Sequence, residues 1–479
     1  MYYFMNKDTV TAQITNRAGR WELSHISAPL PIGDFEINSW LEDRKAFKHN
    51  RHLKQLMMDC GCQTTEGFIR ITHAASINDS FWVKEEGENL SWDGISFYRN
   101  EFNGTISRLA FEGLGLYGIK MSSTSPELTT DGSFRKCWRR EDGEIYLYKR
   151  GISGASNAGL EPYCEALASE LIHQADPKSV QYSVVKLHKE TATKCKSFTN
   201  EEIGFVPLRK LVSRHTTTDG LLDFFHKLGC LEEFQRMVVL DAVTFNVDRH
   251  LGNMGVLVKN ETQEILGIAP NFDFNLSMLP YVEKEEFNDI GTKLLDYGPK
   301  IGDDFTRIGQ ELLTPAIRRE LINLQGFQFS FRGNKEFAPW RVEKMEQLVG
   351  QQIRALLKNE KLCTKDVFIP KAPLKNTLQE TAVFDNTEEL KKASALISRL
   401  KELHGLSAVM EEIEEDNHVS VLATIHEKEG FTDIAIHLGT MEISCEKNGI
   451  ERPFLELAAE SALFGNLYAE ICIIRNEFQ

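Results

Sequence analysis

The stretch Phe245-Asn246-Val247-Asp248-Arg249-His250-Leu251-Gly252-Asn253 sets a carboxylate five residues before an amide side chain. Phosphoryl transfer from ATP needs a carboxylate to orient the attacking hydroxyl, and amide and carboxylate oxygens to hold magnesium against the phosphates. The spacing of Asp248 and Asn253 is typical of a kinase catalytic loop, in which one turn supplies both groups. We therefore expect a phosphoryl-transfer site at this stretch.

A second carboxylate, Asp273, follows twenty positions after Asn253. Two short apolar runs, 254–258 and 264–268, lie between them and are joined by five mainly polar residues, which predicts a hairpin. Because a hairpin returns the chain to where it left, Asp273 should enter the same cleft as Asp248, as a two-metal phosphoryl-transfer site requires. The alternative is a polar helix cap followed by an ordinary hairpin, with His250 a surface imidazole.

The pattern Asn-x-Asp-x-His-x-x-Asn at 246–253, followed by the hairpin and Ala269-Pro270-Asn271-Phe272-Asp273, resembles the HipA-like serine/threonine kinases. That family belongs to the protein-kinase and phosphoinositide-kinase fold group, and the resemblance covers about residues 120 to 365. As in other HipA-like members, Asp273-Phe274-Asn275 lacks the glycine of eukaryotic kinases. The resemblance implies that Asp248 is the catalytic base, that Asn253 and Asp273 hold magnesium, and that Asn246 and His250 brace the loop.

Length and composition suit a globular protein with about three domains, since 42% of the 479 residues are hydrophobic and 26% are charged. No apolar run approaches the roughly 18 residues of a membrane-spanning helix, and the start shows neither a basic region nor a cleavage site. We therefore expect a cytoplasmic protein without membrane association. Among nine cysteines, Cys60-Gly61-Cys62 is too close a pair for a structural zinc site without a second pair.

The element pattern predicts an α+β fold with three parts. A leading α+β domain at 1–125 precedes a bilobal, protein-kinase-like core at 126–365. The stretch Pro370-Lys371-Ala372-Pro373 predicts a linker, and a small α+β module follows at 376–479.

In the leading domain we expect strands at 9–14, 20–23, 81–84 and 92–97, and a helix capped by Asp34. Basic residues crowd the segment Arg44–Lys54, which suits either a solvated helix face or contact with an acidic partner or nucleic acid. Direct nucleic-acid binding is not expected, because aromatic residues are not interleaved with the basic ones.

The start of the core predicts the nucleotide side of the site. Strands 134–139 and 144–149 are joined by an Asp-Gly turn, and Lys149 leaves the second strand where a kinase needs an ammonium for the α- and β-phosphates. A helix from Glu161 follows, and the HipA-like pattern favours Glu161 as the partner of Lys149. Glu165, one turn further along, is the alternative.

Two loops complete the expected nucleotide pocket. The hydroxyl-rich stretch Ser122–Ser133 stands where a kinase covers the phosphates, with Ser125 and Asp131 as nucleotide contacts. By resemblance, Ser123 or Ser125 is a site of autophosphorylation. After strands 180–187 and 193–198, the segment 198–202 should be the hinge beneath the adenine, so Phe198 and Thr199 are also cofactor-binding candidates.

The rest of the core is expected to be helical. A helix at 231–245 should deliver the chain to the catalytic loop, and the helical period recurs at 294–297, 305–313 and 338–357. These helices would form the lower lobe, with the nucleotide pocket between the lobes.

The terminal module concentrates negative charge. Residues 376–479 hold 20 Asp and Glu against 8 Lys and Arg, and thus carry -12 of the net charge of -15. We expect helices at 390–400 and 454–469, strands at 419–424, 433–438 and 441–445, and an acidic loop at 411–416. The module is expected either to contact the basic segment of its own chain or to recruit a partner.

These patterns together predict a serine/threonine protein kinase that uses ATP and Mg²⁺. The resemblance implies autophosphorylation, a protein substrate with a serine or threonine acceptor, and an antitoxin-like or regulatory protein as partner. One alternative is a pseudokinase scaffold, although a scaffold has no need of a base such as Asp248. Another is a lipid kinase or nucleotidyltransferase on the same fold.

Overall fold

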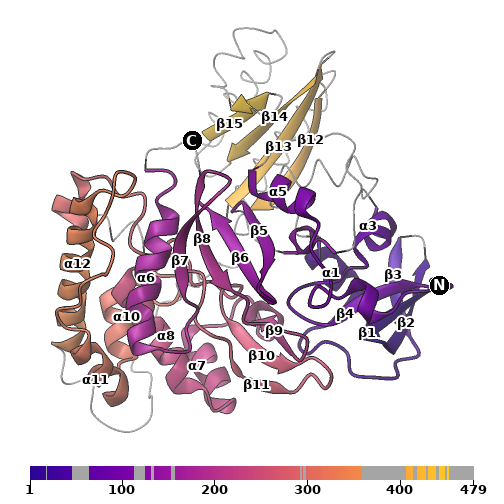
Figure 1. Ribbon diagram of the computed structural model, residues 1–479, viewed down its shortest axis with the longest axis horizontal. Helices are drawn as coiled ribbons and strands as arrows, with labels where there is room; N and C mark the ends of the chain where they lie inside the picture. Colours follow the sequence, from indigo (N-terminus) through magenta and orange to yellow (C-terminus); the bar gives the residue numbers. More distant parts are fainter. Residues whose placement is uncertain are drawn as a thin grey trace, which may run out of the picture. The chain divides into compact units, whose positions relative to one another are not determined.

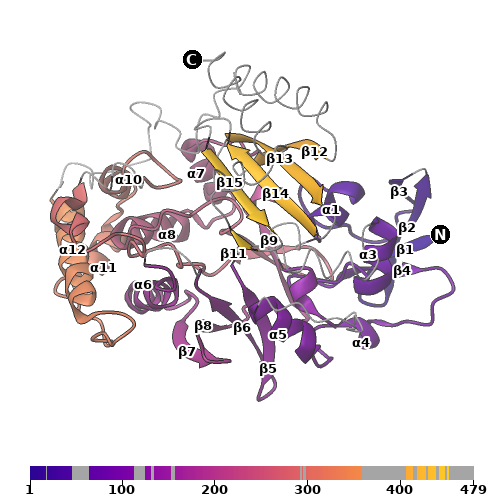
Figure 2. The ribbon, with the colours of Figure 1, turned by 90° about the horizontal axis from the view of Figure 1, so that it is seen from above.

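The computed structural model describes residues 1–17, 19–45, 64–112, 124–130, 134–152, 157–291, 294 and 298–358, together with five strands between 406 and 451. The chain forms two compact units, Met1–Leu378 and Gln379–Gln479. In the described residues, helices combine with several antiparallel sheets, which confirms the expected mixture of α and β structure. Figure 1 and Figure 2 place the first sheet and the helices α10–α12 at opposite ends of the first unit.

The first sheet has the strand order β3-β2-β1-β4. One of its two inner strands, β1, brings Phe4 into the core, where the ring stacks on Phe81 at 5.3 Å and meets Trp40 edge-on at 4.9 Å. Three aromatic rings thus fix helix α1 on one face of the sheet. The elements are β1 (Tyr2–Asn6), β2 (Thr9–Arg17), β3 (Arg20–Ser24), β4 (Phe81–Glu85), α1 (Ile37–Asp43), α3 (Thr65–Thr72), α4 (Trp92–Ile95) and α5 (Gly104–Glu112).

The second sheet has the order β5-β6-β8-β7, and α6 packs along β7 and β8 (Figure 1). Its hairpin confirms the two strands expected around the Asp-Gly turn. Met5 and Trp82 of the first sheet share an apolar cluster with Trp138 and Ile145 of the second, so packing is continuous across the domain boundary predicted near residue 125. The elements are η2 (Pro126–Leu128), β5 (Lys136–Glu141), β6 (Glu144–Arg150), α6 (Glu161–Ala175), β7 (Tyr182–Leu187) and β8 (Glu190–Lys196).

A third sheet, β11-β10-β9, carries the predicted hairpin after the catalytic stretch. Helix α8 precedes that stretch and lies in the largest apolar cluster, which also takes residues from α6, α7 and α10–α12. The elements are β9 (Ile203–Pro207), η3 (Leu208–Lys210), α7 (Thr218–Lys227), α8 (Leu231–Thr244), β10 (Gly255–Lys259), β11 (Ile265–Ile268), η4 (Glu286–Asp289), α10 (Phe305–Glu311), α11 (Pro315–Asn323) and α12 (Pro339–Leu357).

The second unit contains an antiparallel sheet with the order β12-β13-β14-β15-β16. The strands expected in the terminal module are present, although they begin and end at different residues. The elements are β12 (Leu406–Ile413), β13 (His418–Glu427), β14 (Gly430–His437), β15 (Glu442–Lys447) and β16 (Ile450–Glu451). The helices expected at 390–400 and 454–469 lie outside the described residues, as does most of 294–297.

Two expectations for the leading segment are wrong. The stretch expected as a strand at 92–97 begins with helix α4, because Trp92 and Ile95, three residues apart, are buried together on one helical face. The cap of α1 is Glu36 rather than Asp34, since the Glu36 carboxylate accepts hydrogen bonds from the backbone N–H groups of residues 38 and 39.

Two charged segments are described only in part. Of the basic segment, the structure describes Arg44 and Lys45, and Arg44 is buried against Trp40 with a 2.5 Å ion pair to Asp79. The expected acidic loop at 411–416 begins inside strand β12, because residues 411–413 pair with β13. None of the helices in the described part of the chain is both long and apolar enough to cross a bilayer.

Gly255 provides a test of the third sheet. A Cβ atom there would overlap the Val206 carbonyl oxygen and lie 2.9 Å from the Pro207 Cα, both of them backbone atoms that cannot turn away. We expect Gly255→Ala to lower the free energy of unfolding by about 1–3 kcal/mol. Denaturant unfolding measures this, with Gly94→Ala as the control because a Cβ at Gly94 meets no atom within 4 Å. Equal stability of the two variants would contradict the close approach of β9 and β10.

Candidate active site

Helix α8 ends where the predicted catalytic stretch begins. Phe245 adopts a left-handed conformation with φ 53°, and the N–H of Asn246 donates to the Asp241 carbonyl at 2.9 Å. A left-handed residue after the last turn is a common way to stop a helix and redirect the chain. The buried Phe245 ring, 5.7 Å from that of Phe305, holds this turn in place.

A buried ion pair joins helix α8 to the loop that follows it. The guanidinium of Arg249 donates through Nε and Nη2 to both carboxylate oxygens of Asp241, at 2.7 and 2.9 Å. The Asn246 side chain donates to the same carboxylate at 2.9 Å. Both charged side chains are at most 5% exposed, so their pairing is essential to the fold of the loop.

The same guanidinium joins the loop to the segment before Asp273. Its Nη1 donates to the carbonyl oxygens of Asn253 and Phe272, at 2.6 and 2.8 Å, and its Nη2 donates to the Asn271 side chain at 2.6 Å. Arg249 thus fixes the positions of both predicted metal-binding residues. It holds Asn253 by its own carbonyl, and Asp273 by the carbonyl of the preceding residue.

Asp248, Asn253 and His250 come together in the loop. The Asn253 amide nitrogen donates to the Asp248 carbonyl at 3.0 Å and lies 3.5 Å from the Asp248 carboxylate. The Gly252 N–H donates to Nδ1 of His250 at 2.9 Å, which leaves Nε2 to carry the proton, 4.0 Å from Oδ2 of Asp248. Asn246 accepts from the Asp248 N–H at 3.0 Å.

The environment of Asp248 makes its carboxylate a stronger base than an ordinary aspartate. Burial raises the pKa of Asp248 to about 6, and the negative charge of Asp273 adds to the effect. The side chain is nevertheless 25% exposed, so a hydroxyl group from outside can reach it. A group with a pKa near neutrality suits proton transfer at physiological pH.

Lys149 bridges two carboxylates on different elements. Its ammonium lies 2.6 Å from the Glu165 carboxylate on α6 and pairs with Asp273. Burial alone would lower the pKa of Lys149, but Asp273 and Glu165 outweigh burial and raise it. Burial would likewise raise the pKa of Asp273, yet Lys149 lowers it, so Asp273 stays ionised.

The partner of Lys149 on α6 is therefore Glu165 and not Glu161, the residue favoured from the sequence. Helix α6 begins at Glu161, so Glu165 stands one full turn further in and faces the sheet, where Thr193 of β8 donates to it at 2.6 Å. Glu161 instead accepts from the Tyr281 hydroxyl at 2.7 Å and from the Ile152 N–H at 3.3 Å. It closes the loop after Lys149.

The backbone of Asp273 has an uncommon conformation and is hydrogen-bonded to Tyr182. It has a φ of 61°, and its N–H donates to the Tyr182 hydroxyl at 3.1 Å. A non-glycine residue in this left-handed region is uncommon and often marks a functional position. The preceding residue, Phe272, packs against Phe198 and Phe205 at 5.3 and 5.4 Å.

The other residues predicted to contact the nucleotide lie in different surroundings. Phe198 belongs to this aromatic cluster, whereas the buried Thr199 side chain donates to the Ile77 carbonyl at 2.7 Å. Ser125 is 1% exposed, and its hydroxyl has no hydrogen-bond partner among the described residues. Ser123 and Asp131 lie outside the residues that the structure describes.

Comparison with known proteins gives distant structural similarity. No protein-family model matches the chain, and no curated protein matches it by sequence. The Helicobacter pylori proinflammatory kinase CtkA aligns at 15% identity and a TM-score of 0.37, over 48% of this chain and 92% of its own. A chain from the Shewanella oneidensis toxin–antitoxin complex of HipA, HipB and operator DNA aligns at 10% identity and a TM-score of 0.44, over 75% of this chain and 100% of its own. At these TM-scores the function proposed below depends on site geometry alone.

Asn253 and Asp273 suit a magnesium ion that also takes oxygen ligands from a nucleotide. The Asn253 nitrogen is turned to Asp248, so its amide oxygen is available, and Asp273 stays ionised. No group of three His, Cys, Asp or Glu in the described ranges could hold a metal by itself. Mg²⁺ commonly uses one or two carboxylates together with substrate phosphates, which fits this sparse set.

Sequence reasoning missed Asp241, Arg249 and Asn271. The signal for Asp241 was its place in Val238-Val239-Leu240-Asp241-Ala242-Val243, since a lone carboxylate in a buried apolar run must find a partner. Arg249 lies inside the quoted stretch at a position that the motif does not specify, and nothing in the spacing identifies its four partner residues, Asp241, Asn253, Asn271 and Phe272.

The raised pKa of Asp248 predicts a cost in stability. The folded form holds a proton up to a pH of about 6, whereas the unfolded carboxyl loses it near 3.9, so the contribution of Asp248 to stability falls as pH rises between these values. We expect Asp248→Asn to raise the free energy of unfolding at pH 8 by roughly 1–2 kcal/mol and to change it little at pH 4. Denaturant unfolding at both pH values measures the difference. Lower stability of Asp248→Asn than of wild type at pH 8 would show that burial does not disfavour the ionised Asp248 carboxylate.

Proposed function

We propose that the protein is a serine/threonine protein kinase that uses ATP and Mg²⁺. The observation that carries the proposal is the convergence of Lys149, Glu165 and Asp273 beside the loop of Asp248 and Asn253. An ammonium, a metal-binding pair and a base are the groups that phosphoryl transfer needs. A pseudokinase scaffold would not need the raised pKa of Asp248.

In this mechanism, the chain mainly positions charge. Lys149, oriented by Glu165, would bind the α- and β-phosphates, and Asn253 and Asp273 would hold Mg²⁺, which neutralises charge on the phosphates. Asp248 accepts the proton of the acceptor hydroxyl as its oxygen attacks the γ-phosphorus and the bond to the β-phosphate oxygen breaks. Arg249 and Asn246 hold the loop without contact with the reacting atoms.

The acceptor we propose is a serine or threonine hydroxyl of a protein, including a hydroxyl of the chain's own segment 122–133. Phosphate there would place negative charge beside the nucleotide phosphates and lower activity. An antitoxin-like or other regulatory protein is the proposed partner. Mass spectrometry after incubation with ATP identifies the modified residues.

Replacement of the base separates binding from transfer. We expect Asp248→Ala to bind ATP with nearly unchanged affinity and to lower kcat by about 10²–10⁴-fold, because the base acts on the acceptor. Radiolabelled ATP measures transfer, and label should pass from the γ-phosphate and not from the α-phosphate. Asp223→Ala, an exposed carboxylate on α7, is the control.

Wild-type kcat/KM should rise with pH through about 6, as the base ionises. Wild-type turnover in Asp248→Ala would remove Asp248 from catalysis. Transfer from the α-phosphate would instead identify a nucleotidyltransferase.

The proposed metal ligands predict a change in magnesium dependence. We expect Asn253→Ala and Asp273→Asn each to raise the Mg²⁺ concentration for half-maximal activity by roughly tenfold, because each removes an oxygen ligand or its charge. A titration of activity against Mg²⁺ at fixed ATP measures the midpoint, with Asp223→Ala as the control. An unchanged midpoint in both variants would exclude these residues from the metal site.

A further inference from the structure

The connector 197–202 joins the second sheet to the third, since it runs from the end of β8 to the start of β9. Phe198 within it packs on Phe272, the residue before Asp273. A shift of the connector would therefore move the segment expected to bind the adenine. It would also move the backbone beside Asp273, a proposed metal ligand. What fixes the connector should influence nucleotide binding.

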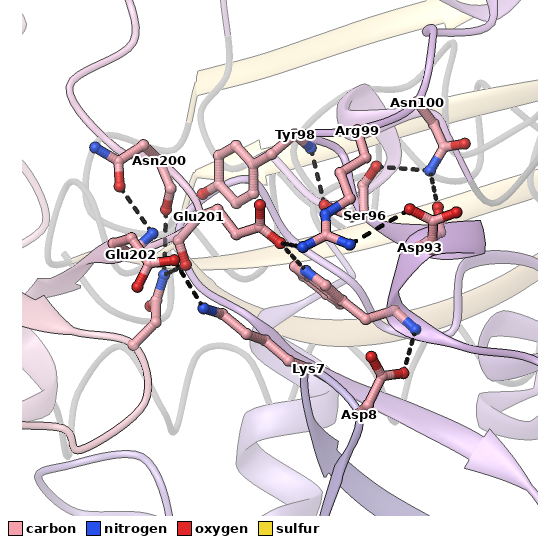
Figure 3. A network of polar contacts seen from close by, with 12 residues as sticks. Lys7, Asp8, Asp93, Ser96, Tyr98, Arg99, Asn100, Asn200, Glu201 and Glu202 are labelled. Atoms are coloured by element: carbon pink, nitrogen blue, oxygen red, sulfur yellow. Dashed lines mark hydrogen bonds and ion pairs between the residues drawn. The ribbon is translucent and has the colours of Figure 1, made fainter.

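Side chains of the leading segment hold the connector through Glu201. The indole Nε1 of Trp92 donates to Oε1 of Glu201 at 2.6 Å, and Nη2 of Arg99 lies 2.6 Å from the same oxygen. Figure 3 shows the Arg99 guanidinium pointing to the Glu201 carboxylate. Burial would raise the pKa of Glu201, but Arg99 and Trp92 lower it, so the carboxylate is ionised when it accepts these bonds.

Trp92 is itself immobilised. It is 2% exposed, its backbone N–H donates to the Asp8 carboxylate at 2.7 Å, and its side chain belongs to an apolar cluster with Met5 and Trp82. Its hydrogen bond to Glu201 is therefore made from a rigid position and costs little conformational entropy.

Neighbouring residues add a second set of contacts. Lys7 pairs with Glu202 at 3.0 Å (Figure 3). The Asn260 amide donates to the carbonyls of Asn200 and Glu201, at 3.2 and 3.1 Å, and the Asn6 side chain donates to the Asn260 carbonyl at 2.7 Å. The turn after β1 thus contacts the connector directly through Lys7, and β1 itself reaches it through Asn6 and the hairpin turn.

The backbone of the leading segment also lies against the connector and β9. Thr199 donates to the Ile77 carbonyl at 2.7 Å, and the Phe205 N–H donates to the Asn78 carbonyl at 2.7 Å. A Cβ on Gly204 would stand 2.9 Å from the Asn78 carbonyl oxygen, so only glycine permits this approach. The leading segment therefore contacts the connector at Thr199, Glu201 and Glu202, and also contacts β9.

We propose that the leading segment is a positioning clamp that sets nucleotide affinity through Glu201, with Trp92 and Arg99 as its donors. The inference rests on the proposed function and extends it, because it gives the leading segment a role in nucleotide binding. Trp92 contributes more than Arg99, since the Arg99 side chain is 45% exposed and its ion pair is screened by salt. By linkage, nucleotide binding tightens the clamp by the same factor that the clamp gives to nucleotide affinity.

The clamp is tested with full-length variants and two measurements. Glu201→Ala removes the acceptor, Glu201→Gln keeps a neutral acceptor, and Trp92→Phe removes the donor but keeps an aromatic ring. The control is Glu144→Gln, which removes an exposed ion pair to Lys196 on the second sheet, a contact that involves no residue of the leading segment. The measurements are the Kd for Mg²⁺ with the non-hydrolysable analogue AMP-PNP, and hydrogen exchange of amides 198–203 in the free protein.

We expect Trp92→Phe to raise the Kd about threefold and Glu201→Ala, which also loses the ion pair to Arg99, to raise it up to about tenfold, because only part of the lost interaction is coupled to nucleotide binding. Glu201→Gln should lie between wild type and Glu201→Ala, and kcat should stay within about twofold of wild type. Exchange at 198–203 should accelerate in the same order, and Glu144→Gln should match wild type. If the contacts were purely structural, the variants would have a lower melting temperature. Their Kd values would then not follow this order, and kcat would fall together with nucleotide affinity.

Two outcomes separate this inference from the proposed function. Unchanged Kd and exchange in Glu201→Ala would overturn the clamp, even in an active kinase. A wild-type chain that binds no AMP-PNP would overturn the proposed function and the link to nucleotide affinity, whereas faster exchange in the variants would still establish the grip on the connector.

Discussion

The candidate site depends on one buried guanidinium. All five N–H groups of Arg249 have an acceptor, shared among Asp241, Asn271 and the carbonyls of Asn253 and Phe272. A charge at 2% exposure is tolerated only with such complete pairing. Because its partners come from helix α8, the catalytic stretch and the segment before Asp273, one side chain fixes the relative positions of all three.

Charge is then divided unevenly among the carboxylates of the site. Lys149 compensates Glu165 and Asp273, whereas Asp248 has no lysine or arginine within salt-bridge distance in the described part of the chain. The pKa of Asp273 is therefore lowered and that of Asp248 is raised to about 6. Two carboxylates with opposite shifts suit different tasks, metal binding for one and proton transfer for the other.

Local patterns were reliable where the chain repeats a period or makes a tight turn. The hairpins at 136–150 and 255–268 and helices α6, α8 and α12 follow from alternation, the Asp-Gly turn and the helical period. Strand β1 and helix α11 were not anticipated, and Trp92 was placed in a strand. Short segments carry few repeats, so tertiary packing decides their conformation.

The sequence by itself determined the proposal that Asp248, Asn253 and Asp273 share one candidate site, because the spacing of the first two is local and a hairpin returns the chain to the third. Only the tertiary structure decided that Lys149 pairs with Glu165, since the rotation of α6 against the second sheet sets which carboxylate faces the lysine. The partners of Arg249 and the grip of Trp92 on Glu201 were likewise hidden, because they join residues up to 109 positions apart. Such contacts arise from packing between elements, which no spacing along the chain encodes.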